Sequence, residues 1–178
     1  MDHRPGPRRR ARLIAAALLV AAGIVTATLW PRGLRPGRGS EPPPQPIAFS
    51  HRVHAGENQI PCLYCHVYAR HGAVAGVPSV QRCMGCHTIT AVASAEVQKL
   101  QGYWMRQEPI AWVRVFRQPD FVFFQHRPHV QAGIACQTCH GQVERMDRVR
   151  EAVVLDMDRC VACHRAQQAS IDCLTCHR

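Results

Sequence analysis

The feature that most constrains this chain is the pattern Cys-x-x-Cys-His, which occurs five times and uses every cysteine in the sequence. C-x-x-C-H is the attachment signature of c-type haem: the two thiols form thioethers with the porphyrin vinyl groups, and the adjacent histidine binds the iron as its proximal ligand. The sequence therefore predicts five covalently attached c-type haems.

Each predicted site, numbered 1 to 5 in chain order, supplies two cysteines and one proximal histidine. The residues are Cys62, Cys65 and His66 in site 1; Cys83, Cys86 and His87 in site 2; Cys136, Cys139 and His140 in site 3; Cys160, Cys163 and His164 in site 4; and Cys173, Cys176 and His177 in site 5. Zinc ribbons, redox-active pairs and disulfides are the alternatives, but none of them requires a histidine after every cysteine pair. Haem attachment is therefore favoured at all five sites.

The part of the chain that carries the sites is short. Residues 47–178 provide about 26 residues for each haem, which is too little to build a large hydrocarbon core as well. We expect a multihaem cytochrome fold of mostly short helices and loops wrapped around the haems. One amphipathic helix is predicted over 91–105, where Val92, Val97, Leu100 and Trp104 form an apolar stripe.

The N-terminus has the pattern of a membrane anchor. Segment 1–12 contains five arginines and one aspartate, and segment 13–30 contains no charged residue. A helix of this length, at 1.5 Å per residue, spans about 27 Å, close to the thickness of a bilayer core. We expect 1–12 to stay cytoplasmic and Leu13 to Trp30 to form a single-pass anchor in the cytoplasmic membrane. A cleaved signal peptide, with small residues such as Ala22 and Gly23 at the cleavage site, is the alternative.

A proline-rich stretch separates the anchor from the cysteine motifs. Residues 31–46 contain six prolines and few apolar side chains, which is typical of a semi-extended linker. The sequence thus predicts a pentahaem domain over 47–178, on the periplasmic or outer face of the membrane.

The positive charge does not indicate a nucleic-acid partner. The net charge is +10, but eight of the 22 basic residues precede residue 39 and Lys99 is the only lysine. Residues 47–178 hold 14 basic and 10 acidic residues, a net charge of only +4. A basic binding surface is therefore not predicted.

The domain contains an internal repeat. Phe49-x-His51-x-x-His54 precedes site 1, and Phe124-x-His126-x-x-His129 precedes site 3, 75 residues later. The repeat defines two modules, 47–90 and 122–165, each with two sites, while the fifth site (173–177) is appended. Because histidines three residues apart on a helix lie on one side at different heights, we interpret all four as distal ligands of four different irons.

The fifth iron needs another distal ligand. Met157 is the preferred candidate because it lies three residues before site 4 in the second module. Met146 is the second candidate, and His71, Met105 or an open position remain possible. A thioether ligand would raise the reduction potential of that haem above those of its bis-histidine neighbours.

Taken together, these elements resemble the pentahaem cytochrome c subunit of alternative complex III, a bacterial quinol oxidoreductase. The matching stretches are 49–54, 60–61, 75–80, 109–115, 119–124, 136–141 and 157–165. The histidine pairs alone are also similar to class III multihaem cytochromes c. The family often has a histidine where this chain has Phe116.

The resemblance implies a class III-like fold and an electron-transfer subunit with no catalytic residues of its own. Its expected partners are membrane subunits that oxidise quinol, a subunit resembling iron–sulfur and molybdopterin enzymes, and a downstream cytochrome c or oxidase. An anchored quinol dehydrogenase that works alone, and a multihaem reductase of a small inorganic substrate, are the alternatives.

Overall fold

The computed structural model describes residues 16, 18–20 and 41–177. Segment 1–12, nearly all of the expected anchor 13–30 and most of the linker lie outside the described residues. No helix in the described part of the chain is long and apolar enough to cross a bilayer. The chain divides between Arg35 and Pro36, and all five sites lie in the second unit.

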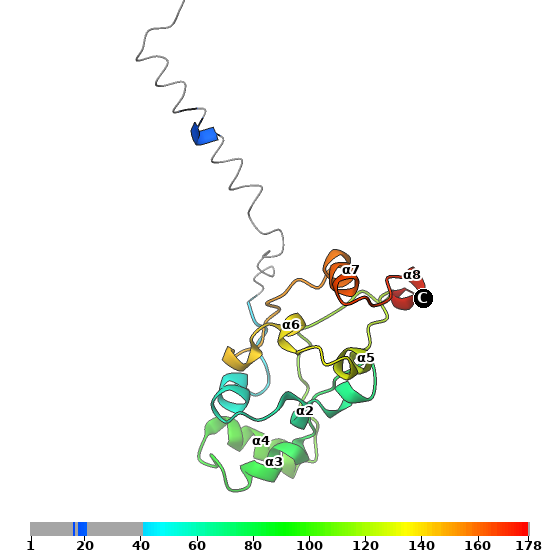
Figure 1. Ribbon diagram of the computed structural model, residues 1–178. Helices are drawn as coiled ribbons and strands as arrows, with labels where there is room; N and C mark the ends of the chain where they lie inside the picture. The colour runs from blue at the N-terminus through cyan, green and yellow to red at the C-terminus, as the bar shows by residue number, and fades with distance from the viewer. Residues whose placement is uncertain (1–15, 17, 21–40, 178) are drawn as a thin grey trace, which may run out of the picture. The chain divides into compact units, whose positions relative to one another are not determined.

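This unit consists of short helices joined by long loops (Figure 1). In chain order the helical elements are η1 (Arg52–Glu57, a π-helix), α2 (Cys62–Cys65), η2 (Val67–Arg70, 3-10), α3 (Val80–His87), α4 (Ala95–Met105), α5 (His126–Gln131), α6 (Gln137–His140), η3 (Val143–Arg145, 3-10), α7 (Met157–Ala166) and α8 (Cys173–Cys176). An isolated antiparallel bridge joins Val122 to His177. The expected architecture of short helices and loops is confirmed for the described residues.

Site 2 and site 4 lie at the ends of matching helices. Helix α3 is N-capped by Ser79, whose side chain accepts a hydrogen bond from the amide of Arg82. Helix α7 is capped in the same way by Asp156 and the amide of Arg159. Such caps satisfy amide groups that have no partner within the helix. Each helix then runs through its Cys-x-x-Cys-His motif and so fixes the spacing of the two thiols and the histidine.

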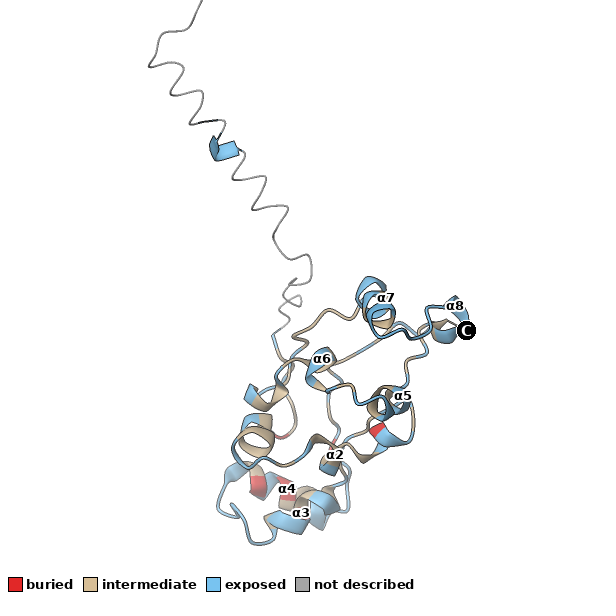
Figure 2. Cartoon of the chain, in the orientation of Figure 1, coloured by how far each residue is buried: buried red, intermediate tan, exposed pale blue. Residues whose placement is uncertain are grey.

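The apolar core is small and is formed by the first module together with α4 and the chain that follows it. Ile47, Met84, Leu100 and Ile110 are buried together, and Val80 is among the partly buried side chains that pack against them. Figure 2 shows that most of the described chain is half-buried or exposed, and no described polar or charged residue is buried. Within the described residues, this matches the expectation of a fold without a large hydrocarbon core.

The predicted amphipathic helix is shorter than expected. Helix α4 begins at Ala95, with Ser94 as its N-cap. Ala91 has a positive φ of 55°, a left-handed conformation that an α-helix cannot contain. The prediction of a helix from residue 91 was therefore wrong by one turn. Val97 and Leu100 are buried as the stripe predicted, but Val92 and Trp104 are exposed.

The last residues of the proline-rich stretch contact the domain. The side chain of Gln45 donates to the carbonyl of Val113 and accepts from its amide, both at 2.9 Å. The amide of Ala48 donates to the Glu96 carboxylate at 2.7 Å. These bonds hold residues 45–48 against α4 and the chain that follows it.

Candidate haem and metal centre

The structure pairs each of the four predicted distal histidines with one proximal histidine. The pairs, with their ring-centroid distances and interplanar angles, are His51 with His66 (6.4 Å, 1°), His54 with His87 (6.0 Å, 61°), His126 with His140 (6.1 Å, 5°) and His129 with His164 (5.9 Å, 47°). The first histidine of each Phe-x-His-x-x-His segment lies opposite the proximal histidine of the first site of its module. The second histidine lies opposite the proximal histidine of the second site.

These distances suit one metal ion between two imidazoles. A metal–nitrogen bond of about 2 Å on each side, added to the distance from each ring centre to its nitrogen, separates the two centroids by about 6 Å. None of the ten cysteines forms a disulfide, so every thiol is available for thioether formation. The donor set of sites 1 to 4 therefore fits a covalently attached haem with two axial histidines.

Backbone carbonyls hold most of these rings through Nδ1. His66 Nδ1 contacts the Gly76 carbonyl at 2.6 Å, and His126 Nδ1 contacts the Ala73 carbonyl at 2.6 Å. The other five such contacts are made by His54, His87, His129, His164 and His177, to the carbonyls of Ser50, Thr90, Gln125, Ser170 and Phe121 respectively. A hydrogen bond at Nδ1 fixes the tautomer that leaves Nε2 free to bind a metal.

His51 is the exception among the distal histidines. Its Nδ1 atom is buried and has no hydrogen-bond partner in the described structure. Burial, together with the smaller effects of the neighbouring His66 and His54, lowers the pKa of His51 to about 4. Burial also lowers the pKa of His140, with additional effects from His126 and His66. Both imidazoles are therefore held in the neutral form, which is the form that binds metals.

The two phenylalanines of the repeat make the same contacts. Phe49 lies edge-on to His51 (4.9 Å, 87°) and stacks on His54 (4.3 Å, 28°). Phe124 lies edge-on to His126 (4.8 Å, 87°) and is tilted against His129 (4.7 Å, 34°). The repeat seen in the sequence is thus also a repeat of side-chain geometry, and each phenylalanine sets the orientation of two imidazoles.

In each module, the residue that follows the first distal histidine is hydrogen-bonded to the other module. The amide of Arg52, in η1, donates to the carbonyl of Met146, and the amide of Arg127, in α5, donates to the carbonyl of Gly72. Met146 follows His140 by six residues, and Gly72 follows His66 by six residues. Helix η1 is therefore held by the segment after site 3, and helix α5 is held by the segment after site 1. The two contacts are reciprocal, as at an interface between two copies related by a two-fold axis.

Neighbouring thiols show the spatial order of the sites. Burial raises the pKa values of Cys83 and Cys136; the nearby thiol of Cys65 adds to the first shift, and the nearby thiol of Cys62 adds to the second. Site 1 therefore lies beside both site 2 and site 3.

The remaining sites continue this series. Burial raises the pKa of Cys139, and the neighbouring Cys163 raises it further. Burial likewise raises the pKa of Cys160, and Cys139 and Cys176 add to the shift. The sites thus follow one another in space in the order 2, 1, 3, 4, 5.

Site 5 is attached to the start of the second module. The amide of Phe123 donates to the carbonyl of Cys176 at 2.8 Å, and the Phe121 ring lies 5.9 Å from the His177 ring. Sequence reasoning missed this role of 121–123. The only sequence signal was the aromatic run that precedes Phe124.

The methionine and histidine candidates for the fifth distal ligand are scattered. Met157 is the first residue of α7 and is 66% exposed. Met146 is half-buried and its methyl carbon lies close to Gly141, next to site 3. His71 and Met105 lie at the ends of η2 and α4, both in the first half of the domain. Phe116, where the resembling family often has histidine, packs edge-on against His140 at 4.5 Å.

Comparison with known proteins shows that part of the chain is similar to a known family. Residues 122–178 match the family of cytochrome c7 and related cytochromes c. The matched segment holds sites 3 to 5, and the match implies covalently bound c-type haem in this cytochrome c7-like segment.

A longer stretch resembles a named protein. Over 102 residues the chain is 34% identical to the "Menaquinone reductase, multiheme cytochrome c subunit" of Nitratidesulfovibrio vulgaris (strain Hildenborough). The match covers 57% of this chain and 48% of that protein, so it spans about half the length of the relative.

Proposed function

We propose that this chain is a membrane-anchored pentahaem c-type cytochrome that relays electrons between a quinone-reactive membrane complex and a second redox carrier. The observation that supports this most strongly is the unbroken series of five neighbouring Cys-x-x-Cys-His sites, four of them with paired histidines. The anchor is Leu13 to Trp30, and residues 47–178 lie on the periplasmic or outer face.

In this proposal every haem ligand comes from this chain. The ten cysteines form the thioethers, and His66, His87, His140, His164 and His177 are the proximal ligands. His51, His54, His126 and His129 are distal ligands, and Met157 is the fifth. Bound haem supplies a reversible one-electron couple whose potential depends on its axial ligands and their hydrogen bonds. The carbonyls at Nδ1 orient the rings, and the two phenylalanines keep the paired imidazoles in place.

The resemblance to alternative complex III favours electron flow out of the quinol pool. Membrane subunits would oxidise quinol, a subunit resembling iron–sulfur and molybdopterin enzymes would accompany them, and a cytochrome c or oxidase would accept the electrons. In this role the chain has no catalytic residues.

The name of the relative favours the opposite direction as a second candidate. A menaquinone reductase passes electrons to menaquinone, so a related subunit would pass electrons toward quinone. A quinol dehydrogenase that works alone and a multihaem reductase of a small inorganic substrate are further alternatives. The proposed distal ligands, four histidines and Met157, match the five haems one for one, and this argues against a reductase because such catalysis requires an open distal position.

Stopped-flow mixing of the purified protein, alone and together with its membrane complex, separates these roles. A relay subunit is reduced by a quinol analogue only when the complex is present. Rapid reduction of the isolated chain would support the quinol dehydrogenase instead. If quinol never reduces the haems in the complex but a reduced soluble cytochrome does, the direction is toward quinone.

A further inference from the structure

The segments before the two Phe-x-His-x-x-His motifs dock on different partners. In the first module, the amide of Ala48 donates to Glu96 of α4. In the second, the equivalent amide, that of Phe123 75 residues later, donates to Cys176 of site 5. Helix α4 and site 5 therefore occupy corresponding places in the two modules.

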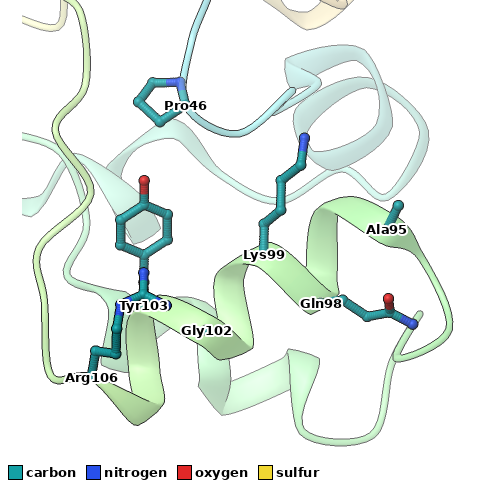
Figure 3. Close-up of a pocket in the computed structure, with 7 residues that line it drawn as sticks. All are labelled: Pro46, Ala95, Gln98, Lys99, Gly102, Tyr103 and Arg106. Atoms are coloured by element: carbon teal, nitrogen blue, oxygen red, sulfur yellow. The ribbon is translucent and has the colours of Figure 1, made fainter.

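Two further pairs of residues support this correspondence. Pro46 lines an open groove over α4, in which the Tyr103 hydroxyl points toward it (Figure 3). Its counterpart Phe121 contacts the ring of His177. Ile47 is buried against Leu100 of α4, and its counterpart Val122 forms the bridge with His177.

The groove in Figure 3 shows no sign of being a site of its own. Its two cationic side chains are already paired, Lys99 with Glu96 at 2.6 Å and Arg106 with Glu108 at 2.7 Å. The groove over α4 lies at the place in the first module that corresponds to the place of site 5 in the second module.

A comparison of helix α3 with helix α7 connects Met157 to this correspondence between α4 and site 5. Ser79 and Asp156 are their N-caps, so Val80 and Met157 are equivalent first residues. Val80 and Cys83, three residues apart on one face of α3, both pack against the cluster that contains Leu100 of α4. The same face of α7 carries Met157 and Cys160.

Cys160, the counterpart of Cys83, has thiols of two other sites as neighbours, Cys139 of site 3 and Cys176 of site 5. The face of α3 that packs against the α4 cluster therefore corresponds to a face of α7 that lies near both site 3 and site 5, and Met157 lies at the N-terminal end of that face.

We propose that Met157 is the distal ligand of site 5 and pairs with His177. The assignment rests on the proposed haem binding and adds to it which site the thioether serves. It also follows that site 5 has one nitrogen and one sulfur ligand, so its potential is the highest of the five. Site 5 lies at one end of the series, where that potential makes it the terminal electron-accepting station.

Spectroscopy on the full-length, haem-loaded protein tests the assignment. Wild type is expected to show one methionine-to-iron charge-transfer band in the near infrared. Met157→Leu should abolish the band and create one ferrous haem that binds carbon monoxide. Met157→His should abolish the band while keeping all irons low-spin, and it should lower the highest potential in the redox titration. Met105→Leu is the matched control and should leave the band unchanged.

A second background shows which site is served. In Cys173→Ala/Cys176→Ala, which lacks site 5, the band should be absent and Met157→Leu should add no carbon monoxide binding. Persistence of the band in Met157→His, its loss in Met146→Leu, or an effect of Met157→Leu that survives removal of site 5 would each overturn the proposal. Haem content is measured on every sample: a wild type with fewer than five haems would refute the proposed function, whereas five haems without the band would refute only the role of Met157.

Discussion

The imidazole rings of His126 and His140 are parallel to within 5°, with centroids 6.1 Å apart. The rings of His51 and His66, at the equivalent positions of the first module, are parallel to within 1° at 6.4 Å. Two stretches of chain 75 residues apart thus arrive at the same arrangement. This agreement supports a simple rule in which the first histidine of each motif serves sites 1 and 3, and the second serves sites 2 and 4.

The rule predicts the effect of removing each distal histidine. His51→Ala, His54→Ala, His126→Ala and His129→Ala should each convert one low-spin haem into a high-spin haem that binds carbon monoxide, because the iron loses one axial nitrogen. Electron paramagnetic resonance and carbon monoxide difference spectra measure this. His71→Ala is the control and should leave the spectra unchanged. A distal variant with the wild-type spectrum would remove that residue from the ligand set.

Glycine at position 56 is required where η1 packs on η3. A Cβ atom at Gly56 would collide with the backbone oxygen of Glu144, whereas a Cβ at Gly72 would meet nothing within 4 Å. Gly56→Ala should therefore lower the free energy of unfolding by about 1–3 kcal/mol, as overpacking does. Gly72→Ala should change it by less than about 0.5 kcal/mol.

Guanidinium unfolding of the haem-loaded protein, followed by fluorescence and by the Soret band, measures both variants. Because η1 begins directly after His51, Gly56→Ala should also produce a high-spin fraction. Equal stability of the two alanine variants would show that η1 and η3 are not packed as described.

Glu96 fixes the end of the proline-rich stretch on α4. Its hydrogen bond with Lys99, and then that with the amide of Ala48, lower the pKa of the Glu96 carboxyl. A lowered folded-state pKa means that the stabilisation is present above the ordinary carboxyl pKa and is lost as the pH falls through the folded value. Glu96→Gln should thus speed amide exchange in 41–50 at neutral pH.

Hydrogen exchange with mass spectrometry follows this segment. The difference between wild type and Glu96→Gln should shrink as the pH falls toward the range where the carboxyl is protonated. Glu108→Gln, which breaks only the pair with Arg106, is the control and should leave exchange in 41–50 unchanged. A control that exchanges as fast as Glu96→Gln would contradict the role of Glu96.

Membrane attachment through 13–30 is a prediction about the mature N-terminus. If the segment is an anchor, N-terminal sequencing should find residues before Leu13, and the protein should stay in the membrane pellet after carbonate extraction. A mature chain that begins after Gly23 would show a cleaved signal and make any membrane attachment depend on partner subunits.

Local patterns name the histidines that the structure brings together in pairs, because the residues of each motif are adjacent in the sequence. The Cys-x-x-Cys-His motifs and the Phe-x-His-x-x-His repeat identified every side chain that the structure pairs. The start of α4 was less predictable, since a left-handed Ala91 depends on the turn before Ser94 rather than on the apolar stripe.

Contacts between the modules could not be read from the sequence. The carbonyls of Gly72 and Met146 accept hydrogen bonds from the other module as backbone groups, so their side chains give no signal. The contact of Cys62 with Cys136, and the docking of 121–123 on site 5, depend on long-range packing. For this reason the order 2, 1, 3, 4, 5 emerges only from the structure.

The number of covalent haems per chain tests the central claim most directly. Pyridine haemochrome absorbance per mole of protein, together with the intact mass after acid denaturation, measures it in fully matured protein. We predict five haems, and four after Cys173→Ala/Cys176→Ala. A count of four or fewer in the wild type would contradict the account.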